Sequence, residues 1–191
     1  KALKNKYFKN ELCQTTLKDE VRAATTLTKL SQLKPVLKTK GSVSAGNASS
    51  LNDGAAFLAL ASSEYIKANK IKPLAKVLSW SSSAGNPDYM GITPITAIQK
   101  LMKKMSVNIS FFDLVEINEA FAATSVAVQR SLQIDPNKLN IVGGAIALGH
   151  PIGCSGTRIV TTLAHQLKRT KKKFGVASMC IGGGQGLAMA I

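Results

Sequence analysis

The chain has 191 residues, of which 45% are hydrophobic and 18% are charged, and its formal net charge is +15. This composition predicts a globular protein rather than a disordered one, and the length suits one substantial domain or one and a half. No apolar run approaches the roughly 20 residues of a membrane-spanning helix, and no secretory signal is visible at the start. The first residue is Lys1 rather than Met, as in a fragment or a processed piece.

The positive charge comes mainly from lysines, which cluster at 1–9, 34–40, 67–76 and 168–173. No aromatic residues are interleaved with them and no recognition motif is present, so we expect no sequence-specific nucleic-acid binding. A basic nucleic-acid binder is an alternative that rests on charge alone, with weak, salt-sensitive binding as its signature. The lysines also suit an anionic ligand or an acidic partner.

Three cysteines, Cys13, Cys154 and Cys180, are widely spaced and form no CxxC pair. Their odd number and spacing argue against a disulfide framework and against a zinc site. The sequence therefore favours a reducing compartment and predicts no metal.

The first part of the chain shows weak helical patterns separated by loops. Residues 1–17 are basic and partly helical in pattern, and 26–33 is predicted as a short helix that Pro35 ends. Small polar residues from 41 to 54 predict a loop, and a helix is predicted over 53–70.

The pattern changes at Pro73, where strands and helices begin to alternate. Helices are predicted at 94–105, 119–132 and 155–169, and strands at 74–80, 113–117, 139–142, 174–181 and 187–191. This βαβαβαββ order predicts an α/β fold with a mixed, mostly parallel sheet and right-handed crossovers. The last two strands are too closely linked for anything but a hairpin.

Three polar or reactive groups stand at the ends of three predicted strands. Asn118 follows one strand, His150 follows another within the glycine-rich loop 143–156, and Cys180 closes a third. Because ligands of open α/β sheets bind beyond the carboxyl ends of strands, these groups can converge on one pocket. Two alternatives stay open: a connecting loop with an incidental histidine, and a small buried core cysteine.

Three sequence blocks carry a family resemblance: Asn118-Glu119-Ala120-Phe121-Ala122-Ala123, the loop 143–156, and Cys180-Ile181-Gly182-Gly183-Gly184. In this order and spacing they resemble the thiolase family, from about Asp19 to the C-terminus. The resemblance implies a thiolase-like fold with helices on both faces of the sheet, as the C-terminal half of a duplicated core. It divides the chain into the end of a loop domain that covers coenzyme A (1–51), a helix of the N-terminal core domain (52–72) and the C-terminal core domain (73–191).

The resemblance also implies an activity: an acyltransferase that condenses two acetyl-CoA to acetoacetyl-CoA, or cleaves a 3-ketoacyl-CoA by thiolysis. Cys180 becomes the acid/base cysteine, a role that suits a lowered pKa. His150 activates a nucleophilic thiol and donates to the thioester oxygen, and Asn118 holds a water that donates to the same oxygen. The Gly182 backbone N–H helps to stabilise the tetrahedral intermediate.

Substrate-binding residues follow from the same resemblance. Met90 and Phe121 wall the acyl pocket, although both suit ordinary packing equally well. Ser49 and Ala45 lie in a block that contacts the pantetheine arm, and Arg22 faces the adenine end, with a surface arginine as the alternative. Coenzyme A thioesters are the substrates, and no cofactor is implied.

The family's nucleophilic cysteine lies in an N-terminal half, and neither Cys13 nor Cys154 lies in a motif that would replace it. The resemblance therefore implies a thiolase N-terminal half as a partner, on the same natural chain or as a separate subunit. It also implies a homo-oligomer, dimer or tetramer, with no specific nucleic acid and no membrane. The expected location is the cytoplasm, or an organellar matrix if a targeting segment is missing. The alternative function is a non-catalytic scaffold subunit that binds CoA or lipid.

Overall fold

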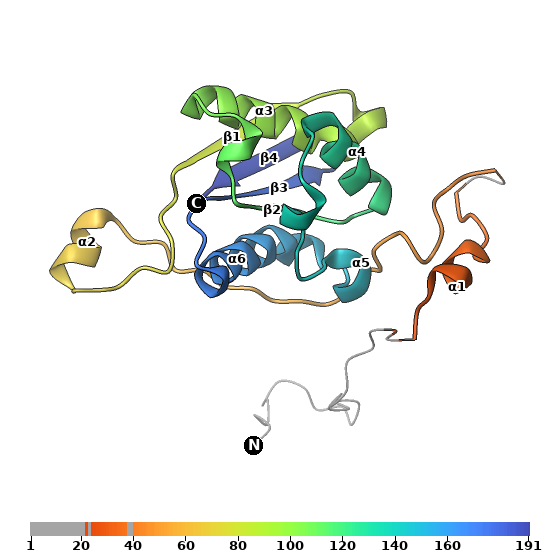
Figure 1. Ribbon diagram of the computed structural model, residues 1–191, viewed down its shortest axis with the longest axis horizontal. Coiled ribbons are helices and arrows are strands. Elements are labelled where there is room, and N and C mark those ends of the chain that lie inside the picture. Colours follow the sequence, from red (N-terminus) through yellow and green to blue (C-terminus); the bar gives the residue numbers. More distant parts are fainter. Residues whose placement is uncertain (1–21, 23, 38–39) are drawn as a thin grey trace, which may run out of the picture.

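A mixed four-stranded sheet lies at the centre of the computed structural model, which describes residues 22, 24–37 and 40–191. Its strand order is β1-β4-β3-β2, with β1 at Ser79–Ala84, β2 at Leu114–Ile117, β3 at Gly175–Ile181 and β4 at Gln185–Ala190. Figure 1 shows α3 (Thr93–Met105) and α4 (Ala122–Leu132) on one side of the sheet and α6 (Ile152–Thr170) on the other. The predicted α/β class with helices on both faces is confirmed.

The pairing of the strands differs from a mostly parallel sheet. β2 and β3 pair in parallel, whereas β4 pairs antiparallel with both β3 and β1. β4 is the returning strand of the predicted C-terminal hairpin, and it inserts between β1 and β3. The other three strands therefore run in one direction, although two of the three ladders are antiparallel.

The remaining helices are short. They are α1 (Leu27–Ser31), α2 (Ser63–Ala68), α5 (Ala145–Leu148) and the 3-10 helices η1 (Pro87–Ile92), η2 (Ile109–Phe111) and η3 (Pro136–Lys138). In Figure 1, α1 and α2 stand away from the sheet and its covering helices. The first strand begins at Ser79, later than the predicted 74–80. The helical pattern predicted for 1–17 lies outside the described residues.

The helix predicted over 53–70 is wrong in its first ten residues, because the structure is helical only from Ser63 to Ala68. From Leu51 to Ser62 the chain has no regular secondary structure, and it exposes Leu51, Phe57 and Leu60 by 87%, 88% and 80%. A short helix gains most of its stability from packing its apolar face. Among the described residues these side chains stay largely in solvent, so the longer helix has little to stabilise it.

The strand predicted at 139–142 is also wrong, and one side chain explains why. Leu139 forms a single parallel bridge with Val115, and the backbone then turns at Asn140, where φ is +45°. The Asn140 amide oxygen accepts a hydrogen bond from Ile117 N at 2.8 Å, and its nitrogen donates to Ile117 O at 2.9 Å. The Asn140 side chain thus makes the two hydrogen bonds that the backbone of a further strand residue would make with Ile117, so the pairing ends there.

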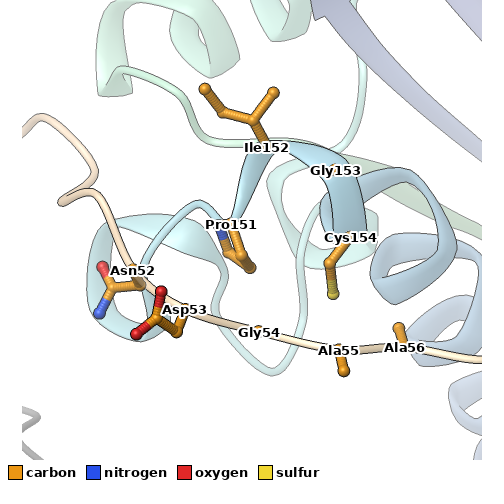
Figure 2. Close-up of a pocket in the computed structure, with 9 residues that line it drawn as sticks. All are labelled: Asn52, Asp53, Gly54, Ala55, Ala56, Pro151, Ile152, Gly153 and Cys154. Atoms are coloured by element: carbon orange, nitrogen blue, oxygen red, sulfur yellow. The ribbon is translucent and has the colours of Figure 1, made fainter.

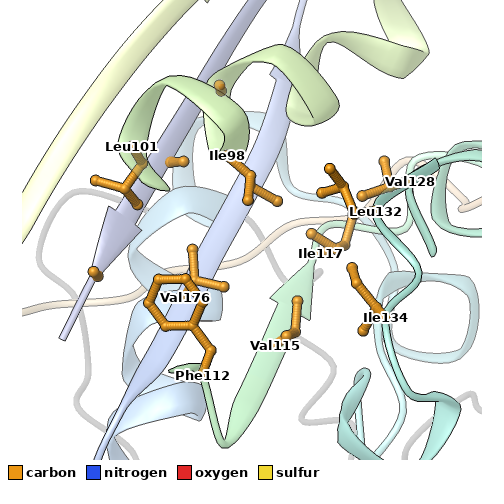
Figure 3. Close-up of a cluster of buried hydrophobic side chains, with 12 residues drawn as sticks. Ile98, Leu101, Phe112, Val115, Ile117, Val128, Leu132, Ile134 and Val176 are labelled. Atoms are coloured by element: carbon orange, nitrogen blue, oxygen red, sulfur yellow. The ribbon is translucent and has the colours of Figure 1, made fainter. Parts of the chain in front are cut away.

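Two hydrophobic clusters pack against β2, one on each face of the sheet. Figure 3 shows the cluster between the sheet and helices α3 and α4, which includes Ile98, Leu101, Phe112, Val115, Ile117, Val128, Leu132, Ile134 and Val176. A second cluster packs α6 against the other face and includes Leu114, Ile159, Leu163, Leu167, Ala177 and Ile191. Each such side chain contributes about 1.5–3 kcal/mol when fully buried. The end of β2, where Asn118 follows, is therefore firmly anchored.

One charged residue is buried within β2. Glu116 is 2% exposed, and its Oε2 lies 3.9 Å from Nη1 of Arg158 on α6. Within the described part of the chain, Oε2 of Glu116 and both Nη atoms of Arg158 have no hydrogen-bond partner. Burial raises the pKa of Glu116 to about 7, an effect that Arg158 opposes and nearby Glu119 reinforces. The carboxyl is therefore protonated over part of the neutral range.

We expect the free energy of unfolding to contain a component that falls as pH rises from 4.5, the ordinary pKa, to about 7. In this window the folded state keeps the Glu116 proton that the unfolded state has released, so stability is lost with rising pH. Glu116→Gln should remove this component, about 3 kcal/mol at 1.36 kcal/mol per pKa unit. Urea unfolding at stepped pH measures it. Glu64→Gln, at an exposed carboxyl with a lowered pKa, is the control. Equal slopes in Glu116→Gln and wild type would contradict the expectation.

Candidate active site

Asn118 is fixed directly after β2. Its backbone N–H donates to Ser178 O at 3.0 Å, which continues the pairing of β2 with β3 by one residue. Its side chain is 0% exposed, and Nδ2 lies 3.2 Å from Nε2 of His150. Oδ1 has no hydrogen-bond partner among the described residues. A buried amide oxygen without a partner is available to a water or to a substrate group.

His150 reaches Asn118 from the loop between α5 and α6. Its backbone N–H donates to Ser50 O at 3.0 Å, and its Nδ1 lies 2.6 Å from Oγ of Ser155 on the first turn of α6. The Ser155 hydroxyl donates in turn to Pro151 O at 3.1 Å. The strand predicted at 139–142 does not form, and α5 and Gly149, whose φ is +93°, directly precede the histidine. His150 therefore follows a short helix rather than a strand.

These contacts define the proton positions on the His150 ring. If the Ser155 hydroxyl donates to Pro151 O, it accepts from Nδ1–H, and Nε2 then accepts from the Asn118 amide. Burial lowers the pKa of His150, and the positive charge of Arg158 lowers it further. The ring is thus neutral near pH 7, with the basic lone pair on Nε2 next to Asn118. Sequence reasoning missed Ser155, whose signal is its place five residues after His150 at the start of a helix.

Cys180 lies at the same edge of the sheet, near the end of β3. Because Ile117 is in register with Ser178, Cys180 stands one residue beyond the level of Asn118. Strand alternation puts Cys180 on the face of Val176, which packs in the core under α3. The structure shows no hydrogen bond from the thiol to Asn118 or His150 among the described residues. Asn118 and His150 are brought together, and the convergence of Cys180 with them stays a prediction.

The expected lowering of the Cys180 pKa is wrong for this chain. Cys180 is 8% exposed, and burial raises the pKa of its thiol, although a backbone hydrogen bond partly opposes this. Burial disfavours the charged thiolate, and no positive group among the described residues offsets it. The resting group is a thiol, which is the proton-donating form.

The turn after Cys180 is open at one end and anchored at the other. Gly182 is exposed, and a Cβ there would meet nothing within 4 Å. Gly184 has a φ of +85°, and its O accepts from Gly85 N at 2.8 Å. Met90, on η1, is 39% exposed, and η1 packs against β3, β4, α3 and α4. Gly182 and Met90 thus lie close to the end of β3 that carries Cys180.

The segment 47–50 ties the two loops of the site together. Ser49 donates from its backbone N–H and from its hydroxyl to Ala120 O, both at 3.0 Å. Ala48 forms an antiparallel bridge with the half-buried Phe121. With the bond from His150 to Ser50 O, this segment places Ser49 and Phe121 beside the Asn118–His150 pair. Ala45 and Arg22 are exposed, and no hydrogen bond within the described part of the chain brings either of them to the site.

A shallow hollow of about 360 Å³ lies beside the start of α6. Figure 2 shows residues 52–56 running past Pro151–Cys154, with the Cys154 sulfur pointing toward that segment. None of the predicted catalytic residues lines it. Within residues 22, 24–37 and 40–191, no three His, Cys, Asp or Glu side chains are grouped to hold a metal ion. In the same residues no helix has the length and apolarity needed to cross a membrane.

A neutral histidine is held against a buried amide at the edge of the α/β sheet. Such a pair suits proton transfer next to the polarised oxygen of a bound substrate.

Comparison with known proteins gives the family. The model of the thiolase C-terminal domain matches residues 71–191, and that of the thiolase N-terminal domain matches 1–64. The chain belongs to the thiolase family, as the sequence blocks predicted.

Individual relatives agree with this assignment. The mitochondrial 3-ketoacyl-CoA thiolase of Rattus norvegicus is 48% identical over 179 residues, which cover 93% of this chain and 45% of that protein. The crystal structure of Bacillus anthracis acetyl-CoA acetyltransferase superposes with a TM-score of 0.88 at 48% identity, over 91% of this chain and 44% of that one. The human mitochondrial 3-ketoacyl-CoA thiolase in complex with CoA gives a TM-score of 0.83 at 43% identity, over 90% of this chain and 44% of that one. The chain thus spans less than half the length of these relatives.

Proposed function

We propose that this chain is the C-terminal part of a thiolase-type acyltransferase acting on coenzyme A thioesters. The reaction is the condensation of two acetyl-CoA to acetoacetyl-CoA with release of CoA, or the reverse thiolysis of a 3-ketoacyl-CoA. The observation that carries the proposal is the 3.2 Å contact between Asn118 Nδ2 and His150 Nε2, with Asn118 Oδ1 buried and without a hydrogen-bond partner among the residues that the structure describes. This arrangement provides a base and an anchor for a water beside one carbonyl oxygen.

Each residue then has a defined step. His150 Nε2 takes the proton from the nucleophilic thiol of the N-terminal half, and the thiolate attacks the thioester carbon as CoA leaves. Asn118 Oδ1 holds the water that donates to the oxygen of the second thioester. Cys180 exchanges a proton with the carbon next to that carbonyl, and the Gly182 N–H supports the tetrahedral intermediate. In the thiolysis direction the thiol form of Cys180, which burial favours, is the form needed to protonate the departing carbon.

The substrate contacts belong to the same proposal. Ser49 uses its hydroxyl proton on Ala120 O, and its oxygen can still accept from a pantetheine amide. Ala45 lies in the same loop, Arg22 meets the adenine end, and Met90 and Phe121 wall the acyl pocket. The human relative solved with CoA supports a CoA thioester as the ligand. No further cofactor is needed for this chemistry.

The N-terminal half of a thiolase is the proposed partner, and an apolar surface supports it. A hollow of about 510 Å³ opens beside α6 on the sheet and is lined in part by Leu58, Leu60, Val77, Trp80, Leu187 and Met189. Trp80 and Leu187 are 57% and 41% exposed, and Phe57, which directly precedes Leu58 in the chain, is 88% exposed. Apolar surface of this kind marks an interaction site. The missing half of the relatives' length is the occupant that fits, on the same natural chain or as a separate subunit.

The oligomeric state and the cellular location complete the proposal. The assembly is a homo-oligomer, dimer or tetramer, and it works in the cytoplasm or in an organellar matrix, as the mitochondrial relatives suggest. The alternative is a non-catalytic subunit that binds CoA or lipid or acts as a scaffold. No observation on the described residues favours it over the enzyme. CoA binding without turnover in the complete assembly would support it.

Reconstitution tests the proposal. We expect this chain, co-expressed with a thiolase N-terminal half that carries its nucleophilic cysteine, to cleave acetoacetyl-CoA in the presence of CoA. Trp80→Glu should prevent the association, because it places a charge in the apolar hollow. Leu27→Glu, at an 85% exposed position on α1, is the matched control and should leave association intact. A well-folded complex without thiolysis activity would contradict the proposal.

A further inference from the structure

Glu119 lies between the two loops of the site, and neither the proposed mechanism nor the pairing of strands uses it. It follows Asn118 directly and is half-buried. Its Oε1 accepts a hydrogen bond from Asn140 Nδ2 at 3.0 Å, and its Oε2 accepts from the backbone N–H of Ile146 at 3.1 Å. We call these two bonds the Glu119 clasp. They join the residue after Asn118 to the first turn of α5, four residues before His150.

The clasp occupies a place where strand pairing is missing. β2 ends at Ile117, and only Leu139 continues the sheet on that side. The Asn140 amide bonds to both backbone groups of Ile117 and gives its remaining hydrogen to Glu119. All hydrogen-bonding groups of the Asn140 side chain except one oxygen lone pair are thereby used. The His150 loop is thus held to β2 by side chains rather than by a ladder.

The backbone at Gly144 leaves room for this arrangement. A Cβ on Gly144 would lie 2.6 Å from Cδ of Glu119 and 2.7 Å from its Oε2. The φ of Gly144 is −157°, an extended value that alanine adopts readily. A methyl group at this position would therefore act on the Glu119 carboxylate and not on the backbone conformation.

We propose that Glu119 is a positioning residue that holds the His150 loop against Asn118, and that Gly144 is required for it to do so. Both carboxylate oxygens are engaged by the protein, so the role that we assign to Glu119 acts on the loop rather than on the substrate. The Asn118–His150 contact is a single bond of 3.2 Å between groups on separate loops. A displacement of about 1 Å at such a site costs on the order of 100-fold in rate. The catalytic consequence rests on the proposed function, whereas the placement of the ring does not.

The first test uses kinetics of the complete assembly. Glu119→Ala should lower kcat for thiolysis about 100-fold, and Glu119→Gln, which keeps one acceptor, about tenfold, with KM for acetoacetyl-CoA within about twofold. Ile98→Val, a buried change on α3 far along the chain from both loops, controls for lost stability and should keep kcat. A kcat of Glu119→Ala within twofold of wild type would overturn the proposal. So would an equal loss in Ile98→Val.

The second test reads the ring directly and does not depend on activity. The chain has two histidines, His150 and His165, so a histidine-labelled NMR spectrum is simple, and His165→Ala assigns it. Burial and Arg158 on α6 lower the pKa of His150 in the wild type. In Glu119→Ala and Glu119→Gln the loop should move toward solvent, and this pKa should rise toward its ordinary value. An unchanged titration in both variants would overturn the proposal, even if kcat falls. If the wild-type assembly is inactive, the proposed function fails while this titration still decides the clasp.

A double-mutant cycle isolates the pair. Gly144→Ala alone should lower kcat and shift the His150 titration in the same direction as Glu119→Ala. In the Glu119→Ala background, where the carboxylate is gone, adding Gly144→Ala should change both by less than about twofold. Full additivity of the two losses would mean that Gly144 acts independently of Glu119 and would overturn that part of the proposal.

Discussion

Replacing His150 by alanine is expected to lower thiolysis by the complete assembly about 10²- to 10⁴-fold. In the proposed mechanism the ring supplies both the Nε2 lone pair that activates the nucleophilic thiol and the donor to the thioester oxygen, so the substitution removes both. Ser155 and Asn118 fix the ring on its two nitrogens, so loss of the imidazole also frees these partners. We expect acyl-enzyme formation and carbon–carbon cleavage to fail together. Stopped-flow detection of CoA release and a steady-state thiolysis assay measure the two steps.

His165→Ala is the matched control for this experiment. His165 is the other histidine of the chain, lies in α6 and is exposed. It has no role in the site, so this variant should keep full activity and show that losing a histidine is not harmful in itself. A His150→Ala enzyme that retains more than about a tenth of wild-type kcat would show that the imidazole is not the base.

The positions of the two paired groups followed from local sequence patterns. Asn118 comes after a short strand of three apolar residues and one acid that is buried on both faces, so the residue after it is well fixed. His150 lies between Gly149, which can adopt the positive φ of +93° found there, and Pro151, whose ring fixes its own φ, so the backbone turn at the histidine is determined locally. The C-terminal hairpin followed from its short glycine turn. These features are determined within a few residues, which is why the sequence alone was enough to predict them.

Other features depend on contacts that no local pattern encodes. The strand predicted at 139–142 has suitable apolar residues, yet the Asn140 side chain takes the hydrogen bonds that would have extended it. The Glu119 clasp and the bond from Ser155 to His150 are side-chain contacts whose partners become neighbours only after folding. The pKa of Cys180 was predicted in the wrong direction because burial outweighs its backbone hydrogen bond.

The helix predicted over 53–70 failed for a related reason. The prediction rested on a start signal near Asp53, but a helix of this kind also needs a partner that buries its apolar side chains. In this chain Phe57 and Leu60 remain exposed, and Leu60 lines the apolar hollow at Trp80. The exposure of these side chains explains why the longer helix is not stabilised, and it also supports the proposed N-terminal partner. Binding that partner would bury surface that this chain cannot cover by itself.

Replacing Cys180 by alanine is expected to separate the two chemical steps. Condensation and thiolysis should fall about 10²- to 10⁴-fold, because the group that exchanges the carbon-bound proton is gone. In the proposed mechanism, acyl transfer to the nucleophilic cysteine uses His150 rather than Cys180, so acetyl-CoA should still give a burst of released CoA. This outcome differs from that of His150→Ala, in which both steps fail. A Cys180→Ala enzyme that loses the burst as well would contradict the assigned role.

Cys154→Ala is the matched control, because Cys154 is the other free cysteine among the described residues and is more exposed than Cys180. It should leave both steps unchanged. Cys180→Ser tests the chemistry further, since a hydroxyl of similar size has a far higher pKa than a thiol and exchanges the proton poorly. We therefore expect Cys180→Ser to resemble Cys180→Ala. Near wild-type turnover in Cys180→Ser would mean that Cys180 fills space at the end of β3 and takes no part in proton transfer.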